Sequence, residues 1–234
     1  MTMSRPVLLP TAARDEQFAG YTYHVEGELV PVLTVEVKPG QTVYFEHHIM
    51  LWKHQSIEIG LRPMQGMLKR MMAGMQIFVT QATGSGQIAF SRDGAGHIFA
   101  LHLDQGQEVQ VREHQFLAAT DNVDYTFERV KGISNIMLGS TGFFIDKFHG
   151  HKGEGILWLH GYGNVFEKVL APGETIQVEP GGWLYKDTSV HMETKFQRIT
   201  SGLLAGFNFV TNNFTGPGRV GIQSMSLIIP SDDK

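Results

Sequence analysis

The sequence predicts an all-β protein in which three tandem units close into a ring or barrel, accompanied by one short methionine-rich helix. Two observations predict this architecture. A phrase centred on a turn glycine occurs three times at a nearly constant spacing, and a GxG phrase followed by an apolar run also occurs three times. Apolar and polar residues alternate around the turn-glycine phrases, which indicates short β-strands.

The first repeated phrase contains Gly40, Gly106 and Gly173, within VEVKPGQTVYF, LHLDQGQEVQV and KVLAPGETIQV. The glycines are 66 and 67 residues apart (106 − 40 and 173 − 106). Ten and eleven residues after them stand three apolar pairs: Met50-Leu51, Phe116-Leu117 and Trp183-Leu184. We therefore expect each phrase to form two antiparallel strands joined by a tight turn.

The second repeated phrase, GSG, GEG or GPG, begins at Gly84, Gly153 and Gly216. The first copy is close to the GxGxx(G/A) pattern of a dinucleotide-binding loop. That loop requires a helix directly after it, because the amides at the helix N-terminus hold the phosphates. Apolar, strand-like runs follow all three copies instead, so we interpret the glycines as turn residues with positive φ.

The positions of the two phrases predict how the units are arranged. A GxG phrase precedes the second and third turn glycines but not the first, while an extra copy stands at the C-terminus. We therefore expect one domain over residues 1–234 with repeats at about 18–83, 84–152 and 153–215. The C-terminal strand, 216–228, is expected to complete the first repeat and close the ring, which would remove exposed sheet edges.

Residues 62–75, RPMQGMLKRMMAGM, are the one stretch with helical periodicity. A narrow apolar stripe is formed by Met64, Met67, Leu68, Met71 and Met75. Such a stripe is most often core, here a short helix that caps the barrel, but methionine also adapts to varied partner surfaces. The candidates for contact with a partner or a membrane surface are Met67, Arg70, Met71 and Met75.

The segment FHGHKGEGILWLHG is the sequence feature closest to a catalytic motif. His149, His151 and Glu154 resemble the first metal motif of the cupins, and two histidines at i and i+2 on a strand point to the same side. The spacing to Glu154 is short for that motif, and APGETIQVEPGGW, the segment of the later Pro-Gly turn where a second cupin motif is expected, contains no histidine. A polar surface hairpin is the alternative reading, and we expect no bound metal or other cofactor.

Composition excludes several classes of protein. The chain has 234 residues, a formal net charge of −4 and no cysteine, so disulfides, thiolate metal sites and cysteine nucleophiles are absent. A nucleic-acid partner is not expected because such proteins usually carry a basic bias. No apolar stretch approaches the length of a membrane span. We expect a soluble, cytoplasmic protein.

The chain resembles the altered-inheritance-of-mitochondria 24-type family over roughly residues 15–228. The resemblance is carried by NFTGPGRVGIQSM, by the turn-glycine phrases and by LKRMMAG followed by FVTQATGSG. It implies three tandem units like those of the tryptophan-RNA-binding attenuation protein, arranged about a pseudo-threefold axis. The family brings no established reaction with it. Its mitochondrial members support inner-membrane organisation, but we see no Arg/Ser-rich transit peptide in this sequence.

These observations predict a non-enzymatic binding or assembly scaffold that self-associates and presents loops to a protein or small ligand. The first alternative is a metal-dependent enzyme of small molecules built on His149, His151 and Glu154. The second is RNA binding by analogy of fold, which predicts affinity that falls steeply with salt.

Overall fold

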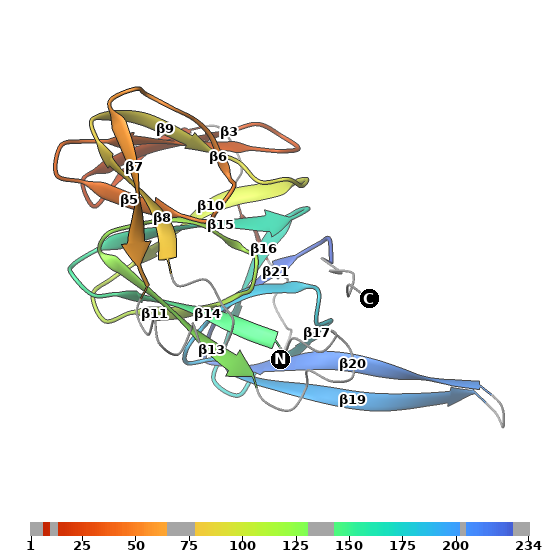
Figure 1. Cartoon of the computed structure of the whole chain (residues 1–234). Coiled ribbons are helices and arrows are strands. Elements are labelled where there is room, and N and C mark those ends of the chain that lie inside the picture. The colour runs from red at the N-terminus through yellow and green to blue at the C-terminus, as the bar shows by residue number, and fades with distance from the viewer. Residues whose placement is uncertain (1–6, 10–13, 65–77, 131–142, 202–204, 227–234) are drawn as a thin grey trace.

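The structure is a computed structural model that describes residues 7–9, 14–64, 78–130, 143–201 and 205–226 (Figure 1). Every secondary-structure element in these ranges is a β-strand, so the all-β prediction is confirmed. Within the same ranges, no helix with the length and apolarity of a membrane span occurs.

The helix predicted for 62–75 lies almost entirely outside the described residues. This holds for Met67, Arg70, Met71 and Met75, the candidates for partner contact. The described beginning of the segment differs from the prediction, because Arg62 and Pro63 end strand β7. Met64 is buried in a core cluster.

Three successive stretches of the chain make the same strand pairings, and we call them the first, second and third strand groups. We number the six strands of each group one to six in chain order. In each group, strand six pairs with strands one and three, and strand five pairs with strands two and four. The first group comprises β4 (Val32–Val37), β5 (Thr42–Phe45), β6 (Met50–Lys53), β7 (Ile57–Pro63), β8 (Phe78–Gly84) and β9 (Gly86–Phe90).

The second group comprises β10 (Gly96–Leu103), β11 (Glu108–Arg112), β12 (Phe116–Thr120), β13 (Val123–Val130), β14 (Phe143–Gly150) and β15 (Gly155–Tyr162). The third comprises β16 (Val165–Leu170), β17 (Thr175–Val178), β18 (Trp183–Asp187), β19 (His191–Ser201), β20 (Ala205–Thr215) and β21 (Gly218–Gln223). Before them come β1 (Val7–Leu8), β2 (Arg14–Phe18) and β3 (Tyr21–Glu26).

The predicted turn glycines stand between strands one and two of each group. Gly40, Gly106 and Gly173 have φ of 86°, 87° and 77°, a conformation that costs glycine nothing because it lacks a Cβ atom. The predicted hairpin-like phrases are confirmed as strand–turn–strand segments. Strands one and two then diverge into different sheets instead of pairing with each other.

The GxG phrases lie between strands five and six of each group, and a strand follows every copy. Positive φ occurs at Gly84, Gly86, Gly153 and Gly218, as predicted for turn glycines. The remaining two glycines of the phrases are not in that region. A Cβ atom built on Gly84 would lie 2.3 Å from the Ser56 carbonyl oxygen.

Replacing Gly84 with alanine is therefore expected to lower the free energy of unfolding by at least about 3 kcal/mol, since a strained φ and a backbone clash combine. Gly40→Ala is the matched control, because its φ is also positive but no atom lies within 4 Å of the added Cβ. It should cost only about 1–2 kcal/mol. Urea unfolding measures both variants, and equal losses would contradict the proposed clash.

The strands form four sheets in which each inner sheet joins two strand groups. One inner sheet has the order β10-β15-β12-β5-β8-β7, and the other has β1-β16-β21-β18-β11-β14-β13. The outer sheets, β2-β3-β4-β9-β6 and β17-β20-β19, come mainly from the first group and wholly from the third. The groups are thus connected by two strand pairs, β5–β12 and β11–β18, which we call the first and second junctions.

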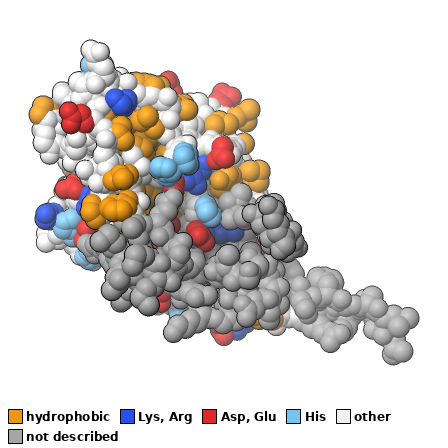
Figure 2. All heavy atoms as spheres, viewed as in Figure 1, with side chains coloured by type: hydrophobic (Ala, Val, Ile, Leu, Met, Phe, Trp, Pro, Cys, Tyr) orange, Lys and Arg blue, Asp and Glu red, His pale blue; other side chains and the backbone are white. Residues whose placement is uncertain are grey.

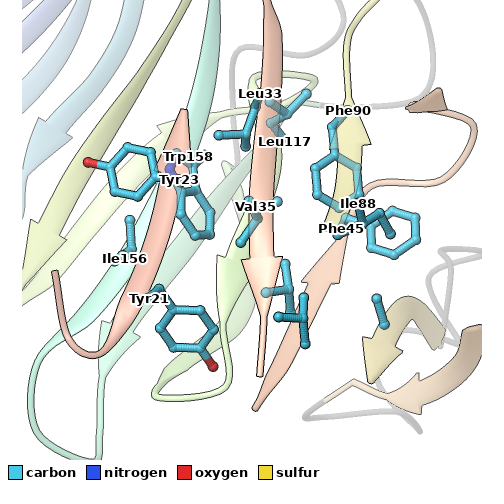
Figure 3. Packing of buried hydrophobic residues seen from close by; sticks show 14 of the residues in the cluster. Tyr21, Tyr23, Leu33, Val35, Phe45, Ile88, Phe90, Leu117, Ile156 and Trp158 are labelled. Carbon is cyan, nitrogen blue, oxygen red and sulfur yellow. The ribbon is translucent and has the colours of Figure 1, made fainter. Parts of the chain in front are cut away.

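Three hydrophobic clusters fill the space between successive sheets. The first contains Tyr23, Val35 and Phe90 of the N-terminal part together with Ile156 and Trp158 of the second group. Figure 3 shows Trp158 beside Tyr23, and their rings meet edge to face with centroids 5.2 Å apart. Because this cluster takes residues from two groups, the groups cannot bury their apolar faces independently.

The predicted return of the C-terminal strand to the first repeat is wrong. Strand β21 pairs with β16 and β18 of its own group, because each GxG strand completes the group that it ends. No extra copy is then left over. The predicted closed ring is not observed among the described strands either, since β6 and β17 lie on separate outer sheets (Figure 1).

Candidate functional site

Strands β6 and β17 each have an edge without a partner among the described strands. Strand β6 pairs only with β9, whereas its counterparts β12 and β18 pair on both edges. Strand β17 pairs only with β20, whereas its counterparts β5 and β11 also pair on both edges. An unpaired edge presents a row of free backbone donors and acceptors that another strand can bind.

The first three side chains of β6 are exposed although they are apolar. Leu51 is 55% exposed and Trp52 is 46% exposed, and Met50 beside them is also exposed. The residues at the same places in the other groups are all buried: Phe116, Leu117 and Ala118 in β12, and Trp183, Leu184 and Tyr185 in β18. The greater exposure of β6 therefore follows from the lack of a described neighbouring strand and not from a difference in residue type.

Further apolar side chains are exposed on the hairpin that follows β6. Ile59 and Leu61 of β7 and Phe78 of β8 are exposed. Hydrophobic side chains are visible over the first group in the upper part of Figure 2. Exposed apolar residues that gather in this way mark interaction surfaces more often than residues that are exposed singly.

The unpaired edge of β17 has a matching character. Ile176 and Val178 are partly buried, while Thr175 and Gln177 between them are exposed. The counterparts of the two apolar residues are fully covered in both other groups: Val43, Phe45, Val109 and Val111. Strand β17 thus has apolar residues at the same positions as β5 and β11, but no described strand covers its second edge.

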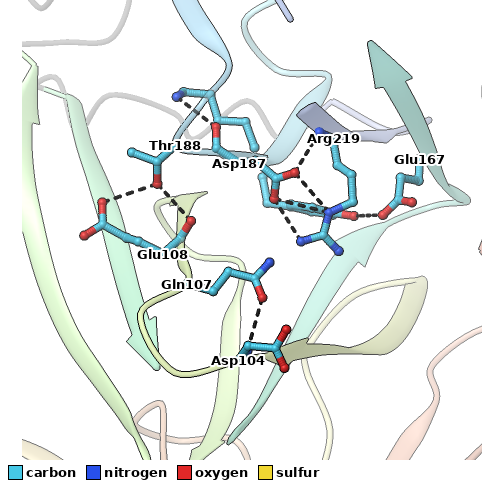
Figure 4. A network of polar contacts seen from close by, with 9 residues as sticks. Asp104, Gln107, Glu108, Glu167, Asp187, Thr188 and Arg219 are labelled. Carbon is cyan, nitrogen blue, oxygen red and sulfur yellow. Dashed lines mark hydrogen bonds and ion pairs between the residues drawn. The ribbon is translucent and has the colours of Figure 1, made fainter. Parts of the chain in front are cut away.

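The two formed junctions reveal how such an edge is closed. At the second junction, the Thr188 hydroxyl donates to the Glu108 carbonyl at 2.8 Å, next to the bidentate Arg219–Asp187 ion pair (Figure 4). At the first junction, the Asp121 amide donates to the Thr42 carbonyl at 3.2 Å. Each junction is therefore fixed by a hydrogen bond just beyond the paired residues.

A lysine ends the exposed strand and has a counterpart at the second junction. Lys53 Nζ donates to the Ile57 carbonyl at 2.7 Å, and Lys186 Nζ donates to the Val190 carbonyl at 2.6 Å. Burial, followed by the charge of Lys147, lowers the pKa of Lys186 to about 8. Lys53 makes the same local bond at an edge that no described strand covers.

The residues predicted as an alternative metal site are not brought together as one. His149 lies in β14, His151 faces Asp124 at 3.3 Å, and Glu154 is exposed in the turn before β15. The side-chain amide of Asn122 donates to the carbonyls of Lys152 and Glu154. These two hydrogen bonds fix the turn at the protein surface. Within the described ranges, no cluster of three or more potential metal ligands occurs.

A buried polar cluster lies beside the first junction. Arg92 donates to the carbonyls of His114 and Phe116, and the His160 amide donates to the Gln115 carbonyl at 2.9 Å. Several buried atoms here lack a hydrogen-bond partner within the described part of the chain: Arg92 Nε, both ring nitrogens of His160 and both side-chain amide atoms of Gln115. Such atoms are normally satisfied by internal water.

His160 makes stability depend on pH. Burial, followed by the charge of Arg92, lowers the pKa of His160 from 6.5 to about 4. The unfolded state therefore binds more protons between these values, and the free energy of unfolding falls as pH drops from 6.5 towards 4. At pH 5 this one histidine lowers the free energy of unfolding by about 2 kcal/mol relative to pH 7.5.

Replacing His160 with glutamine is expected to remove this loss, because the equivalent position of the third group is Gln223, which is also buried. Urea unfolding at pH 7.5 and pH 5 measures the difference between variant and wild type. The exposed His191 provides the control variant His191→Gln. An unchanged pH dependence in His160→Gln would contradict a buried neutral imidazole.

A small pocket of about 50 Å³ lies next to the first junction. Tyr44, Met64, Val79 and Tyr125 are among the residues that line it. Arg62 lies over the Tyr44 ring, 4.9 Å from its centroid, and also pairs with Asp121. The volume of the pocket suits a water molecule and not a metabolite.

Sequence reasoning did not identify the unpaired edges, because no sequence signal marks them. The alignment of Met50-Leu51 with Phe116-Leu117 and Trp183-Leu184 correctly matches the three strands. Their apolar character alone predicts burial for all of them. Only the strand pairing distinguishes the copy that is left open.

Comparison with known proteins places this fold. A crystal structure of a Streptococcus pyogenes protein superposes with a TM-score of 0.67 at 20% sequence identity, covering 88% of this chain and 94% of that protein. No curated protein is similar enough to count as a match. The model of the family described as mitochondrial biogenesis AIM24 matches residues 23–225, which include all three strand groups. The chain therefore belongs to the AIM24 family.

Proposed function

We propose that this protein is a non-enzymatic assembly scaffold that binds a protein partner through the open edge of β6. The observation that carries the proposal is the exposed apolar sequence Met50-Leu51-Trp52, whose two counterparts within the same chain are covered by a neighbouring strand. A partner that supplies a strand would satisfy the free backbone groups and bury the apolar side chains together.

Burial of the exposed apolar side chains of β6 would favour association. Complete burial of a leucine or tryptophan side chain contributes about 1.5–3 kcal/mol relative to exposure. Because Leu51 is 55% exposed and Trp52 is 46% exposed, the two together offer only about 1.5–3 kcal/mol before any backbone hydrogen bond is counted. The strand also lacks proline, and its only lysine stands at the end, so it has few of the devices that protect edge strands.

We also propose that the three strand groups are internal repeats of a single domain. Their pairing patterns agree, and the same break in register occurs where β6, β12 and β18 pair with the last strand of their group. The cores between the sheets support one cooperative unit. The lack of cysteine supports a location in the reducing cytoplasm.

Hydrogen–deuterium exchange tests the proposed role of β6. Amides of residues 50–53 that face the open edge are expected to exchange quickly in dilute protein and to become protected as concentration rises. Peptides from the buried strand β12 serve as an internal reference that should not respond. Exchange in β6 that is independent of concentration would argue against this edge as an assembly surface.

A further inference from the structure

We infer that the strand that covers β6 is β17 of a second copy of this chain, paired antiparallel in one defined register. The register places Trp52 opposite Val178, Lys53 opposite Gln177, and His54 opposite Ile176. This inference rests on the proposed assembly function and goes beyond it by naming the partner and the pairing.

The register follows from the two junctions already present. At the first, Ala118, Ala119 and Thr120 face Phe45, Tyr44 and Val43. At the second, Tyr185, Lys186 and Asp187 face Val111, Gln110 and Val109.

The positions on β6 are fixed through the partner strand within each group. Trp52, Ala118 and Tyr185 all follow the same register break and pair with Ala89, Trp158 and Gly221 at equivalent places. The positions on β17 follow from the turn glycines: Phe45, Val111 and Val178 each stand five residues after one. Both strands of the missing pair are thus aligned independently.

The side chains that this register brings together repeat the chemistry of the formed junctions. The Trp52–Val178 pair combines one aromatic and one smaller apolar residue, as Phe45–Ala118 and Tyr185–Val111 do. Lys53–Gln177 reproduces Lys186–Gln110 residue for residue. Cross-strand pairs are the unit of sheet stabilisation, so agreement at successive positions favours this register over a shifted one.

The hydrogen bonds that flank the two formed junctions predict equivalent bonds at both ends of the β6–β17 pair. The Glu46 amide donates to the Leu117 carbonyl at 2.9 Å, which predicts a bond from the Glu179 amide to the Leu51 carbonyl. The bonds from Asp121 and Thr188 predict that Gln55 donates to the Thr175 carbonyl.

The two outer sheets correspond to the two halves of an inner sheet in their strand order. An inner sheet consists of strands one, six and three of one group joined to strands two, five and four of the preceding group. The N-terminal outer sheet ends with β4-β9-β6, and the C-terminal outer sheet is β17-β20-β19. Joining them through β6 and β17 would produce the same strand order a third time.

A second copy can supply this join without any rearrangement of the chain. The two half-sheets lie at opposite ends of the succession of sheets in Figure 1, with both inner sheets between them. A head-to-tail contact uses the β6 edge of one copy and the β17 edge of the next, which leaves the same two edges free at the ends. Such contacts continue until a ring closes or a filament grows.

Cysteine cross-linking tests both the partner and the register, and the chain offers a cysteine-free background. Lys53→Cys protein is mixed with a size-tagged Gln177→Cys protein under mild oxidation. We expect a disulfide-linked product with the mass of one copy of each. The matched control mixes Lys53→Cys with tagged Val178→Cys, whose side chain lies on the opposite face of the strand. It should give at least tenfold less product.

The other outcomes overturn the inference in distinguishable ways. If the double variant Lys53→Cys/Gln177→Cys links only within one chain, β17 of the same copy covers β6. Equal products from Gln177→Cys and Val178→Cys would rule out the register. If neither mixture links while β6 amides become protected at high concentration, a different partner strand is responsible and only the proposed assembly function stands.

Discussion

Replacing Trp52 with lysine is expected to weaken self-association by about ten- to a hundredfold, because a charged side chain would have to enter an apolar strand junction. Trp52 is nearly half exposed in the single chain, so the free energy of unfolding of the protomer should change by no more than about 1 kcal/mol. Sedimentation velocity at several concentrations measures association, and urea unfolding measures stability.

Val169→Lys is the control for this variant, since Val169 is an exposed apolar strand residue on neither of the open edges. It should leave both association and stability close to those of the wild type. Loss of association in both variants would indicate general surface hydrophobicity, and loss in neither would remove β6 from the interface.

Replacing Trp158 with alanine is expected to lower the free energy of unfolding by about 3–5 kcal/mol. The side chain is fully buried in the first core cluster, where it meets Tyr23 from the N-terminal part of the chain. Its removal leaves a cavity that strands of two different groups line. Because that core is shared, the first and second groups should unfold together in one transition of the variant.

Trp52→Ala provides the matched comparison, with the same substitution at an exposed tryptophan, and should cost less than about 1 kcal/mol. Urea unfolding followed by far-UV circular dichroism measures both. A separate early transition in Trp158→Ala would mean that the groups are independent units.

Much of the fold could be predicted from local patterns in the chain. The alternation around Gly40, Gly106 and Gly173 predicts strands, and the apolar runs after the GxG phrases exclude a phosphate-binding helix at residue 87. These predictions depend on contacts within a few residues, where periodicity and turn chemistry are informative.

The assignment of strands to groups could not be predicted in the same way. Strand β9 lies about fifty residues after β4, with which it pairs, and adjacency in sequence suggested instead that it begins the following unit. That choice produced the incorrect prediction that the C-terminal strand closes a ring. Long-range pairing depends on the shape of the assembled sheets, which local patterns do not contain.

The candidate site was hidden for a related reason. Leu51, Leu117 and Leu184 have the same residue type and the same place in their groups, yet Leu51 is exposed while the other two are fully buried. Exposure at this position is set by the presence of a neighbouring strand group. Among the described strands, only the first group lacks such a neighbour on that side, and the sequence gives β6 no mark of its own.

The mass of the wild-type protein in solution, measured by sedimentation velocity over a wide range of concentration, tests the central claim most directly. We predict a rise from the mass of one protomer to integer multiples of it, since every copy carries one open β6 edge and one open β17 edge. A single species with the mass of one protomer at every concentration would contradict assembly through these edges.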